Sequence, residues 1–162
     1  MPNEVKAEYV AQLSGEYRVF SEVGYKDQSR AEEMGSQLWV DYIRQDLDAG
    51  AHMVITESRE SGKSGICSAN GTLRDGLVDA IADSGLDLDK VLFEAPTKDL
   101  QIELIRRFGA QVNLGNIASS DIVALETLRL GLRGDTLADF DAELGLEPAP
   151  DLRWSAQQAH HA

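Results

Sequence analysis

The sequence predicts an α/β fold built from four consecutive βα units, and three observations support this expectation. Short apolar runs recur along the chain, and glycine, proline or a polar residue closes each run, as expected for buried strands. A segment with apolar residues at helical spacing follows each run. Strands that alternate with helices in this way form a parallel sheet with right-handed crossover connections.

The expected strands are short, and each of them ends near a carboxylate or an amide. They are residues 19–24 ending near Glu22, 53–55 followed by Thr56 and Glu57, 91–94 ending at Glu94, and 112–116 with Asn113 and Asn116. In parallel α/β folds, ligands bind at the carboxyl ends of the strands. The sequence therefore predicts that these polar side chains share one edge of the sheet.

The expected helices are amphipathic segments with recognisable ends. They cover residues 4–13, 37–47, 73–82, 99–108 and 122–130. Gly50, Gly109 and Gly131 follow three of these segments, as is common after a helix. Ser119, Ser120 and Asp121 can cap the last helix, because short polar side chains accept hydrogen bonds from its first amides.

The length of the chain indicates how many domains to expect, and its charge indicates which classes of partner to expect. The chain has 162 residues, which fits one domain, and we expect a partial barrel domain at 1–136 and an acidic, polar C-terminal extension at 137–162. Its 28 acidic residues exceed its 15 basic residues, so the net charge is -13. Nucleic-acid binding needs a basic patch that neutralises phosphates, and we expect no nucleic-acid partner.

The cysteine content and the hydropathy of the chain indicate in which cellular compartment the protein is expected. Cys67 is the one cysteine, which excludes an internal disulfide and a cysteine-based metal site. No apolar run approaches the roughly 20 residues of a membrane helix, and no signal peptide is recognisable. We expect no membrane association and a cytoplasmic location.

Five motifs carry a resemblance to a known family over residues 19–136. They are Glu22–Gly24, Glu57–Gly62, Phe93–Pro96, Asn113–Ala118 and Leu125–Thr136. In this order and spacing they resemble the phosphosulfolactate synthase family. This family also contains plant heat-stress-associated proteins, so membership alone does not fix the reaction.

The resemblance implies a fold and an activity. The family fold is a (β/α)₈ TIM-type barrel, which needs about 250 residues. The four βα units of this chain correspond to the second half of that barrel. The implied reaction is the Mg²⁺-dependent addition of sulfite to phosphoenolpyruvate, which gives (2R)-3-phosphosulfolactate. The enzyme would be a lyase that forms a carbon–sulfur bond, and in methanogens this reaction begins coenzyme M biosynthesis.

The site residues expected on this basis fall into three groups. Lys26 and Glu57 would be catalytic, and Glu22, Glu57 and Glu94 would ligate Mg²⁺, since hard oxygen ligands suit this ion. The remaining group would bind the substrates and consists of Arg59, Lys63, Asn113 and Asn116. Each residue has a simpler alternative: the glutamates could form structural ion pairs, the cations could be solvated in loops, and the asparagines could cap turns.

Two classes of function stay open at this level. The first is a synthase-type enzyme that acts on phosphoenolpyruvate and sulfite. The second is a non-catalytic or partial member of the family, either stress-associated or a half-barrel subunit that is inactive without a partner chain. We expect the chain to form a homo-oligomer or to pair with a chain that carries the first half of the barrel, because a half-barrel exposes strand edges.

Overall fold

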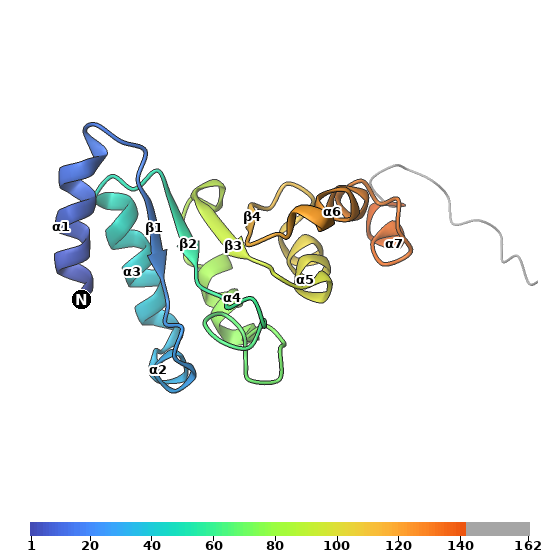
Figure 1. The fold of residues 1–162 in the computed structure, drawn as a ribbon, viewed down its shortest axis with the longest axis horizontal. Coiled ribbons are helices and arrows are strands. Elements are labelled where there is room, and N and C mark those ends of the chain that lie inside the picture. The colour runs from blue at the N-terminus through green and yellow to red at the C-terminus, as the bar shows by residue number, and fades with distance from the viewer. Residues whose placement is uncertain (142–162) are drawn as a thin grey trace, which may run out of the picture.

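The computed structural model describes residues 1–141 as a parallel sheet with helices along one side (Figure 1). The strands are β1 Phe20–Val23, β2 Met53–Thr56, β3 Val91–Glu94 and β4 Leu114–Gly115. The α-helices are α1 Asn3–Ser14, α2 Gln28–Glu33, α3 Ser36–Asp48, α4 Asp75–Ala82, α5 Lys98–Phe108, α6 Ile122–Arg129 and α7 Leu137–Asp141. Two 3₁₀ turns, Leu88–Lys90 and Ser119–Asp121, precede β3 and α6.

The four strands lie in sequence order, β1-β2-β3-β4, and all three neighbouring pairs are parallel. Glu22 is in register with Ile55, and Glu94 with Gly115. A helical crossover joins each strand to the next, as the alternation of apolar runs and helical segments predicts. The expected α/β class is therefore confirmed, and the parallel sheet is compatible with units of a TIM-type barrel.

The ends of the expected helices agree with the structure to within two residues, but strand β4 is shorter than expected, and helices α2 and α7 were not expected. Strand β4 has only two residues, because Asn116 has a φ of 56° and takes the chain out of the extended region. Asn113 and Asn116 therefore flank the strand. Helix α2 was not expected; it has six residues, and Asp27 caps it by accepting a hydrogen bond from the Arg30 N–H.

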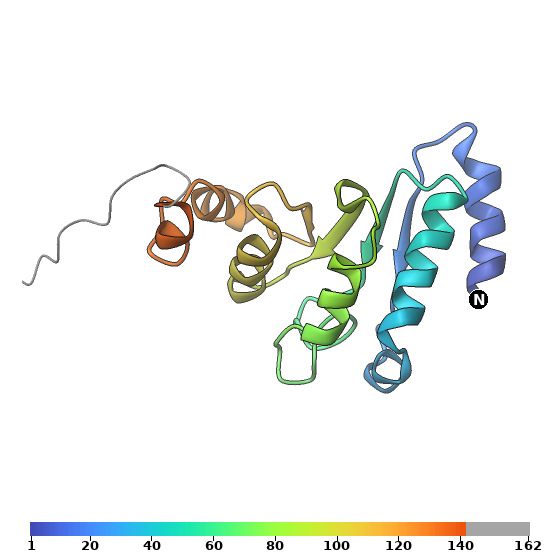
Figure 2. The same ribbon diagram turned by 180° about the vertical axis from the view of Figure 1, so that it is seen from behind.

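The core lies between the sheet and the helices α3, α4 and α5, which cover one face (Figure 2). Alternate strand residues point into this core, including Val23, Val54 and Phe93. Its largest fully buried side chains are Trp39, Phe93, Ile43, Ile66, Leu77, Ile81, Leu100, Leu104, Ile105 and Leu128. Burying each such apolar side chain stabilises the fold by about 1.5–3 kcal/mol.

No helix of the described chain covers the opposite face of the sheet in either view (Figures 1 and 2). The strand residues of that face are only partly buried or exposed, and Phe20 at the edge strand is 50% exposed. Parallel sheets are normally covered on both faces, because their strands lack a solvated side. An uncovered face of this kind is therefore unusual for a parallel sheet.

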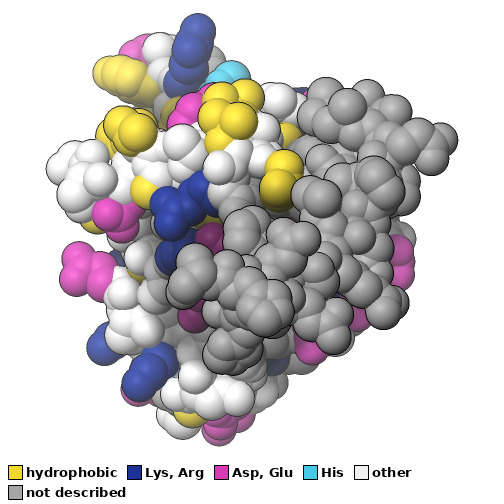
Figure 3. Space-filling view, turned by 90° about the vertical axis from the view of Figure 1, so that its right-hand side faces the viewer, with side chains coloured by type: hydrophobic (Ala, Val, Ile, Leu, Met, Phe, Trp, Pro, Cys, Tyr) yellow, Lys and Arg dark blue, Asp and Glu magenta, His cyan; other side chains and the backbone are white. Residues whose placement is uncertain are grey.

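The end of the molecule that carries α6 and α7 also exposes apolar side chains, and Figure 3 views the molecule from this side. Exposed apolar residues of this region are Ile122, Val123, Leu130, Leu132 and Leu137. Residues 142–162, most of the predicted C-terminal extension, lie outside the described part of the chain. Within residues 1–141, no helix combines the length and the apolar character needed to cross a membrane.

Candidate active site

Three glutamates lie on the uncovered face, at or just beyond the carboxyl ends of adjacent strands. Side chains alternate along a strand, so Glu22 shares its face with Phe20, and Glu94 shares its face with Leu92. Glu57 directly follows β2 and continues the alternation of Met53 and Ile55. The sequence prediction that these carboxylates share one edge of the sheet agrees with this arrangement.

Glu57 is the most buried of the three carboxylates, with 2% of its side chain exposed. Burial raises the pKa of Glu57 to about 7, with further contributions from a hydrogen bond with Glu22 and from the charges of Glu22 and Glu94. The nearby ammonium of Lys26 partly offsets this shift in the pKa. Glu57 can therefore hold or release a proton near neutral pH, which is the property of a general acid or base.

Glu94 is held by the backbone that follows Glu57. The Ser58 N–H donates a hydrogen bond of 2.7 Å to Oε2 of Glu94. Burial raises the pKa of Glu94, and the hydrogen bond from Ser58 opposes that rise. The Asn116 amide in turn donates to the Ser58 carbonyl at 3.2 Å, so the end of β3 and the segments after β2 and β4 are joined at this edge.

Two glycines allow the chain to pack closely around Glu57. A Cβ atom at Gly24 would lie 2.5 Å from the Trp39 ring and 2.8 Å from Cβ of Glu57. A Cβ atom at Gly65 would lie 1.8 Å from the Glu57 carbonyl oxygen, and Gly65 has a φ of +68°. The same carbonyl accepts a hydrogen bond of 2.9 Å from the Ile66 N–H. Core packing and the following loop thus fix the backbone at Glu57.

Lys26 lies in the segment after β1 and reaches the site from its rim. Its Nζ atom is 3.7 Å from Oε2 of Glu57, and 64% of its side chain is exposed. Water screens the exposed ammonium, and at 3.7 Å the contact with the buried carboxylate is long, so this pair contributes little to stability. The position of Lys26 next to the buried carboxylate is therefore more informative about chemistry than about folding.

The four residues that we expect to bind the substrates lie in different parts of the structure. Arg59 and Lys63 are exposed on the loop after Glu57, and neither forms an ion pair with another described residue. Asn116 lies beside Ser58 at the site. Asn113 lies at the opposite end of β3, where its amide donates to the carbonyls of Asp89 at 3.0 Å and Val91 at 3.4 Å. These contacts give Asn113 a structural role, and substrate binding by it stays a prediction.

The carboxylates do not form a ready-made metal cage. Among residues 1–141, no group of three or more His, Cys, Asp or Glu side chains is arranged to hold a metal ion. Mg²⁺ usually binds through one or two carboxylates together with waters and substrate phosphates, and it does not require such a cage. The raised pKa values of Glu57 and Glu94 reflect burial and crowded negative charge that a cation would relieve, so the donor set fits Mg²⁺.

Two residues of the site were not identified from the sequence. Ser58 acts through its backbone N–H, which no side-chain pattern signals. Arg74 donates to the carbonyls of Ala31 at 2.8 Å, Gly65 at 3.2 Å and Met34 at 3.1 Å, and so ties the loop after Glu57 to the α2 region. These partners are distant in sequence from Arg74, apart from Gly65, and only the fold brings them together.

Comparison with known proteins shows which family the chain resembles. The family described as (2R)-phospho-3-sulfolactate synthase (ComA) matches residues 1–135. A phosphosulfolactate synthase of Bacillus subtilis is 52% identical over 136 residues, which is 84% of this chain and 54% of that protein. The phosphosulfolactate synthases of Methanocaldococcus jannaschii and Methanothermobacter thermautotrophicus are 44% and 45% identical, over 74% and 75% of this chain and 48% and 47% of their own lengths.

The chain thus spans about half the length of the curated relatives it matches. The matched part includes all strands that the structure describes and all three site glutamates. At this identity and coverage, the resemblance seen in the five motifs is confirmed. The chain belongs to the (2R)-phospho-3-sulfolactate synthase family.

Proposed function

We propose that this chain supplies one half of a Mg²⁺-dependent active site that adds sulfite to phosphoenolpyruvate and forms (2R)-3-phosphosulfolactate. The observation that carries the proposal is the cluster of Glu22, Glu57 and Glu94, in which Glu57 has a pKa of about 7. Such a strongly shifted carboxyl group at strand ends is typical of an active site. The family of the chain supplies the reaction class, a carbon–sulfur lyase.

The reaction needs one new bond and one proton. The sulfur lone pair of sulfite forms a bond to the terminal alkene carbon, and the π electrons move onto the central carbon and its carboxylate. A general acid then delivers a proton to the central carbon from one face, which sets the 2R configuration. Lys26 and Glu57 are the proton carriers that we assign to this step, because they lie 3.7 Å apart at the site.

The remaining residues would bind and orient the substrates. One or two of the carboxylates of Glu22, Glu57 and Glu94, together with water and substrate oxygens, would hold Mg²⁺, which when bound stabilises the negative charge that develops on the substrate carboxylate. Arg59 and Lys63 are exposed cations without a described ion-pair partner, and they are free to bind phosphate, carboxylate or sulfite oxygens. The Asn116 amide, next to Ser58, could bind a further substrate oxygen.

A second candidate is a partial subunit that is inactive without a partner chain. The uncovered sheet face favours it, because Phe20 is 50% exposed at an edge strand and no described helix covers this face. We propose that a second copy of the chain, or a chain carrying the other half of the barrel, covers this face. Closed two-fold pairs are the commonest assemblies of this kind.

The test is a product assay on two samples. One contains the chain alone, and the other contains the chain co-expressed with the segment of the Bacillus subtilis relative that lies outside the match. The assay follows the loss of phosphoenolpyruvate with sulfite and Mg²⁺ present, and with chelator as a control. Glu57→Gln should abolish turnover, whereas Glu60→Gln, an exposed acid of the same loop, should preserve it.

The outcomes separate the two candidates. Product from the chain alone contradicts the need for a different partner chain and leaves a pair of identical chains as the covering assembly. Product only after co-expression supports the need for a different partner chain. Absence of sulfite-dependent product from both samples, when both are folded by circular dichroism, contradicts the synthase proposal.

A further inference from the structure

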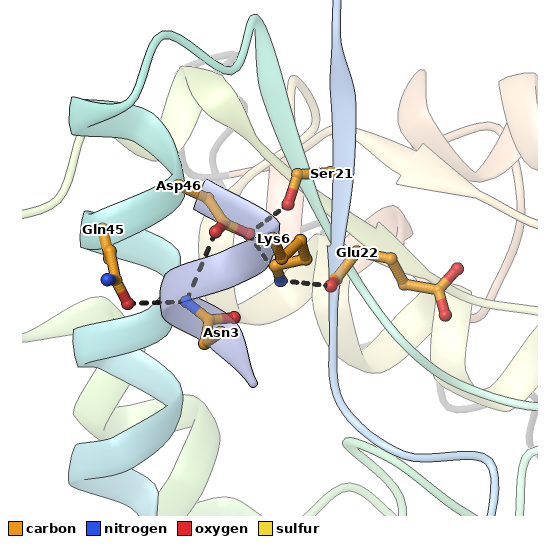
Figure 4. Close-up of polar contacts among 6 residues, drawn as sticks. All are labelled: Asn3, Lys6, Ser21, Glu22, Gln45 and Asp46. Atoms are coloured by element: carbon orange, nitrogen blue, oxygen red, sulfur yellow. Dashed lines mark hydrogen bonds and ion pairs between the residues drawn. The ribbon is translucent and has the colours of Figure 1, made fainter. Parts of the chain in front are cut away.

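A buried polar cluster lies behind the edge strand that carries Glu22 (Figure 4). Its centre is Asp46 of α3, whose side chain is 0% exposed. Lys6 of α1 places its Nζ atom 2.7 Å from Oδ2 of Asp46, and the hydroxyl of Ser21 donates to the same oxygen. Asn3 donates to Oδ1 of Asp46 at 3.4 Å. One carboxylate therefore joins α1, α3 and β1.

Lys6 also contacts the strand directly. Its ammonium donates a hydrogen bond of 2.8 Å to the backbone carbonyl of Glu22. Val19 and Val23 accept hydrogen bonds from His52 and Glu57 on the β2 side, so the Glu22 carbonyl between them faces the free edge of the sheet. In Figure 4 the Glu22 side chain extends away from Lys6. Lys6 therefore holds the backbone of Glu22 without contacting its carboxylate.

Little else attaches this corner of the molecule. Strand β1 has four residues and one strand neighbour, β2. Helix α1 buries only Asn3, Ala7 and Val10, and it leaves Tyr9 and Leu13 about half exposed. Apolar packing of α1 is therefore limited, and polar contacts, including the ion pair between Lys6 and the fully buried Asp46, attach much of this helix. Removing one partner of a buried pair leaves an uncompensated charge, which is strongly unfavourable.

We propose that Lys6 and Asp46 form a positioning pair that fixes the backbone of Glu22 at the edge of the sheet, so that the Glu22 carboxylate meets Glu57. Neither residue touches the reacting atoms; both act through Ser21 and Glu22. The functional meaning of this positioning rests on the proposed function. The positioning itself is a property of the folded chain and is measured without substrate.

The test is amide hydrogen exchange, read at two positions by nuclear magnetic resonance. The Glu57 N–H donates to the Val23 carbonyl and reports the docking of β1 at the site. The Phe93 N–H donates to the Asn113 carbonyl on the far side of the sheet and reports the remaining fold. The variants are Lys6→Met, Lys6→Arg and Ser21→Ala. Lys90→Met is the control, because Lys90 forms an exposed ion pair with Asp87.

In Lys6→Met we expect protection of the Glu57 amide to fall by about tenfold more than protection of the Phe93 amide, because β1 opens locally. Lys6→Arg should retain much of the protection of the Glu57 amide. Lys90→Met should not lower the protection of the Glu57 amide relative to that of the Phe93 amide. If Lys6→Met does not fold, Ser21→Ala provides the same comparison, because it removes a single hydrogen bond to Asp46. Equal losses at the two amides, or no loss at Glu57, would overturn the positioning role.

A synthase assay on the same variants keeps this inference separate from the proposed function. If the wild-type chain is inactive, alone and with its complement, the exchange result still decides whether Lys6 and Asp46 position Glu22. If the enzyme is active, a positioning role predicts that Lys6→Met lowers kcat and Lys6→Arg recovers it. If kcat and the amide exchange of Glu57 are both unchanged in Lys6→Met, two independent measurements contradict the inference.

Discussion

Replacing Gly65 with alanine should be unusually damaging, because Gly65 packs directly against the backbone of Glu57. A new Cβ atom would lie 1.8 Å from the Glu57 carbonyl oxygen and 2.6 Å from its carbon. Those atoms must separate by about 1.5 Å to reach ordinary contact. The movement would break the hydrogen bond from the Ile66 N–H to the Glu57 carbonyl. The positive φ of +68° adds about 1–2 kcal/mol for any residue with a side chain.

Gly85 is a matched control for this substitution. Its φ is +72°, and a Cβ atom there would meet no atom within 4 Å. Gly85→Ala should therefore cost only the backbone term of about 1–2 kcal/mol. Gly65→Ala should cost about 3–5 kcal/mol, because it adds the loss of a buried hydrogen bond and displacement of the chain.

Urea denaturation of both variants measures the two free energies of unfolding. Since domains are stable by only about 5–15 kcal/mol, Gly65→Ala should leave a marginal fold. Equal losses of stability in the two variants would refute the close packing of the loop against Glu57.

Three further predictions concern the site and the open face. The pKa of Glu57 is about 7 in the folded chain against 4.5 ordinarily, so the folded state binds more protons between these values and stability falls as pH rises through this window. Glu57→Gln should remove up to about 3 kcal/mol of the difference in unfolding free energy between pH 5 and pH 8, as measured by urea denaturation. Lys26→Ala should abolish product formation by the active assembly. The melting temperature should stay nearly unchanged, because the Lys26 side chain is 64% exposed. Unchanged turnover would shift the proton-donor role to Lys63. Light scattering at micromolar concentration should detect an assembly larger than one chain, and Phe20→Lys should weaken it; a cooperatively melting monomer would contradict the covered-face proposal.

The fold and the edge that carries the candidate site were predictable from the sequence, because both follow from local patterns. The alternation of apolar runs and helical segments sets the parallel order of the strands, and period-2 alternation brings Glu22, Glu57 and Glu94 to one face. The pKa of Glu57 was not predictable, since it depends on burial by a loop and on neighbours from other strands.

Contacts between residues that are far apart in the sequence could not be predicted from sequence patterns. Lys6 and Asp46 are 40 positions apart, and nothing in either helix signals that they pair. The role of Asn113 also depended on a boundary that the sequence did not show. Because β4 begins at Leu114, the Asn113 amide bonds to the start of β3 and lies away from the site.

Packing within this chain holds the carboxylates in place independently of whatever covers the open face. The Trp39 ring and the side chain of Glu57 both pack closely against Gly24, and the Ser58 N–H holds Glu94. Water still reaches the uncovered face, where Glu22 is exposed. Covering this face would remove water and strengthen every electrostatic interaction at the site. We therefore expect a preformed arrangement of carboxylates in the isolated chain, and catalytic electrostatics that develop fully only after assembly.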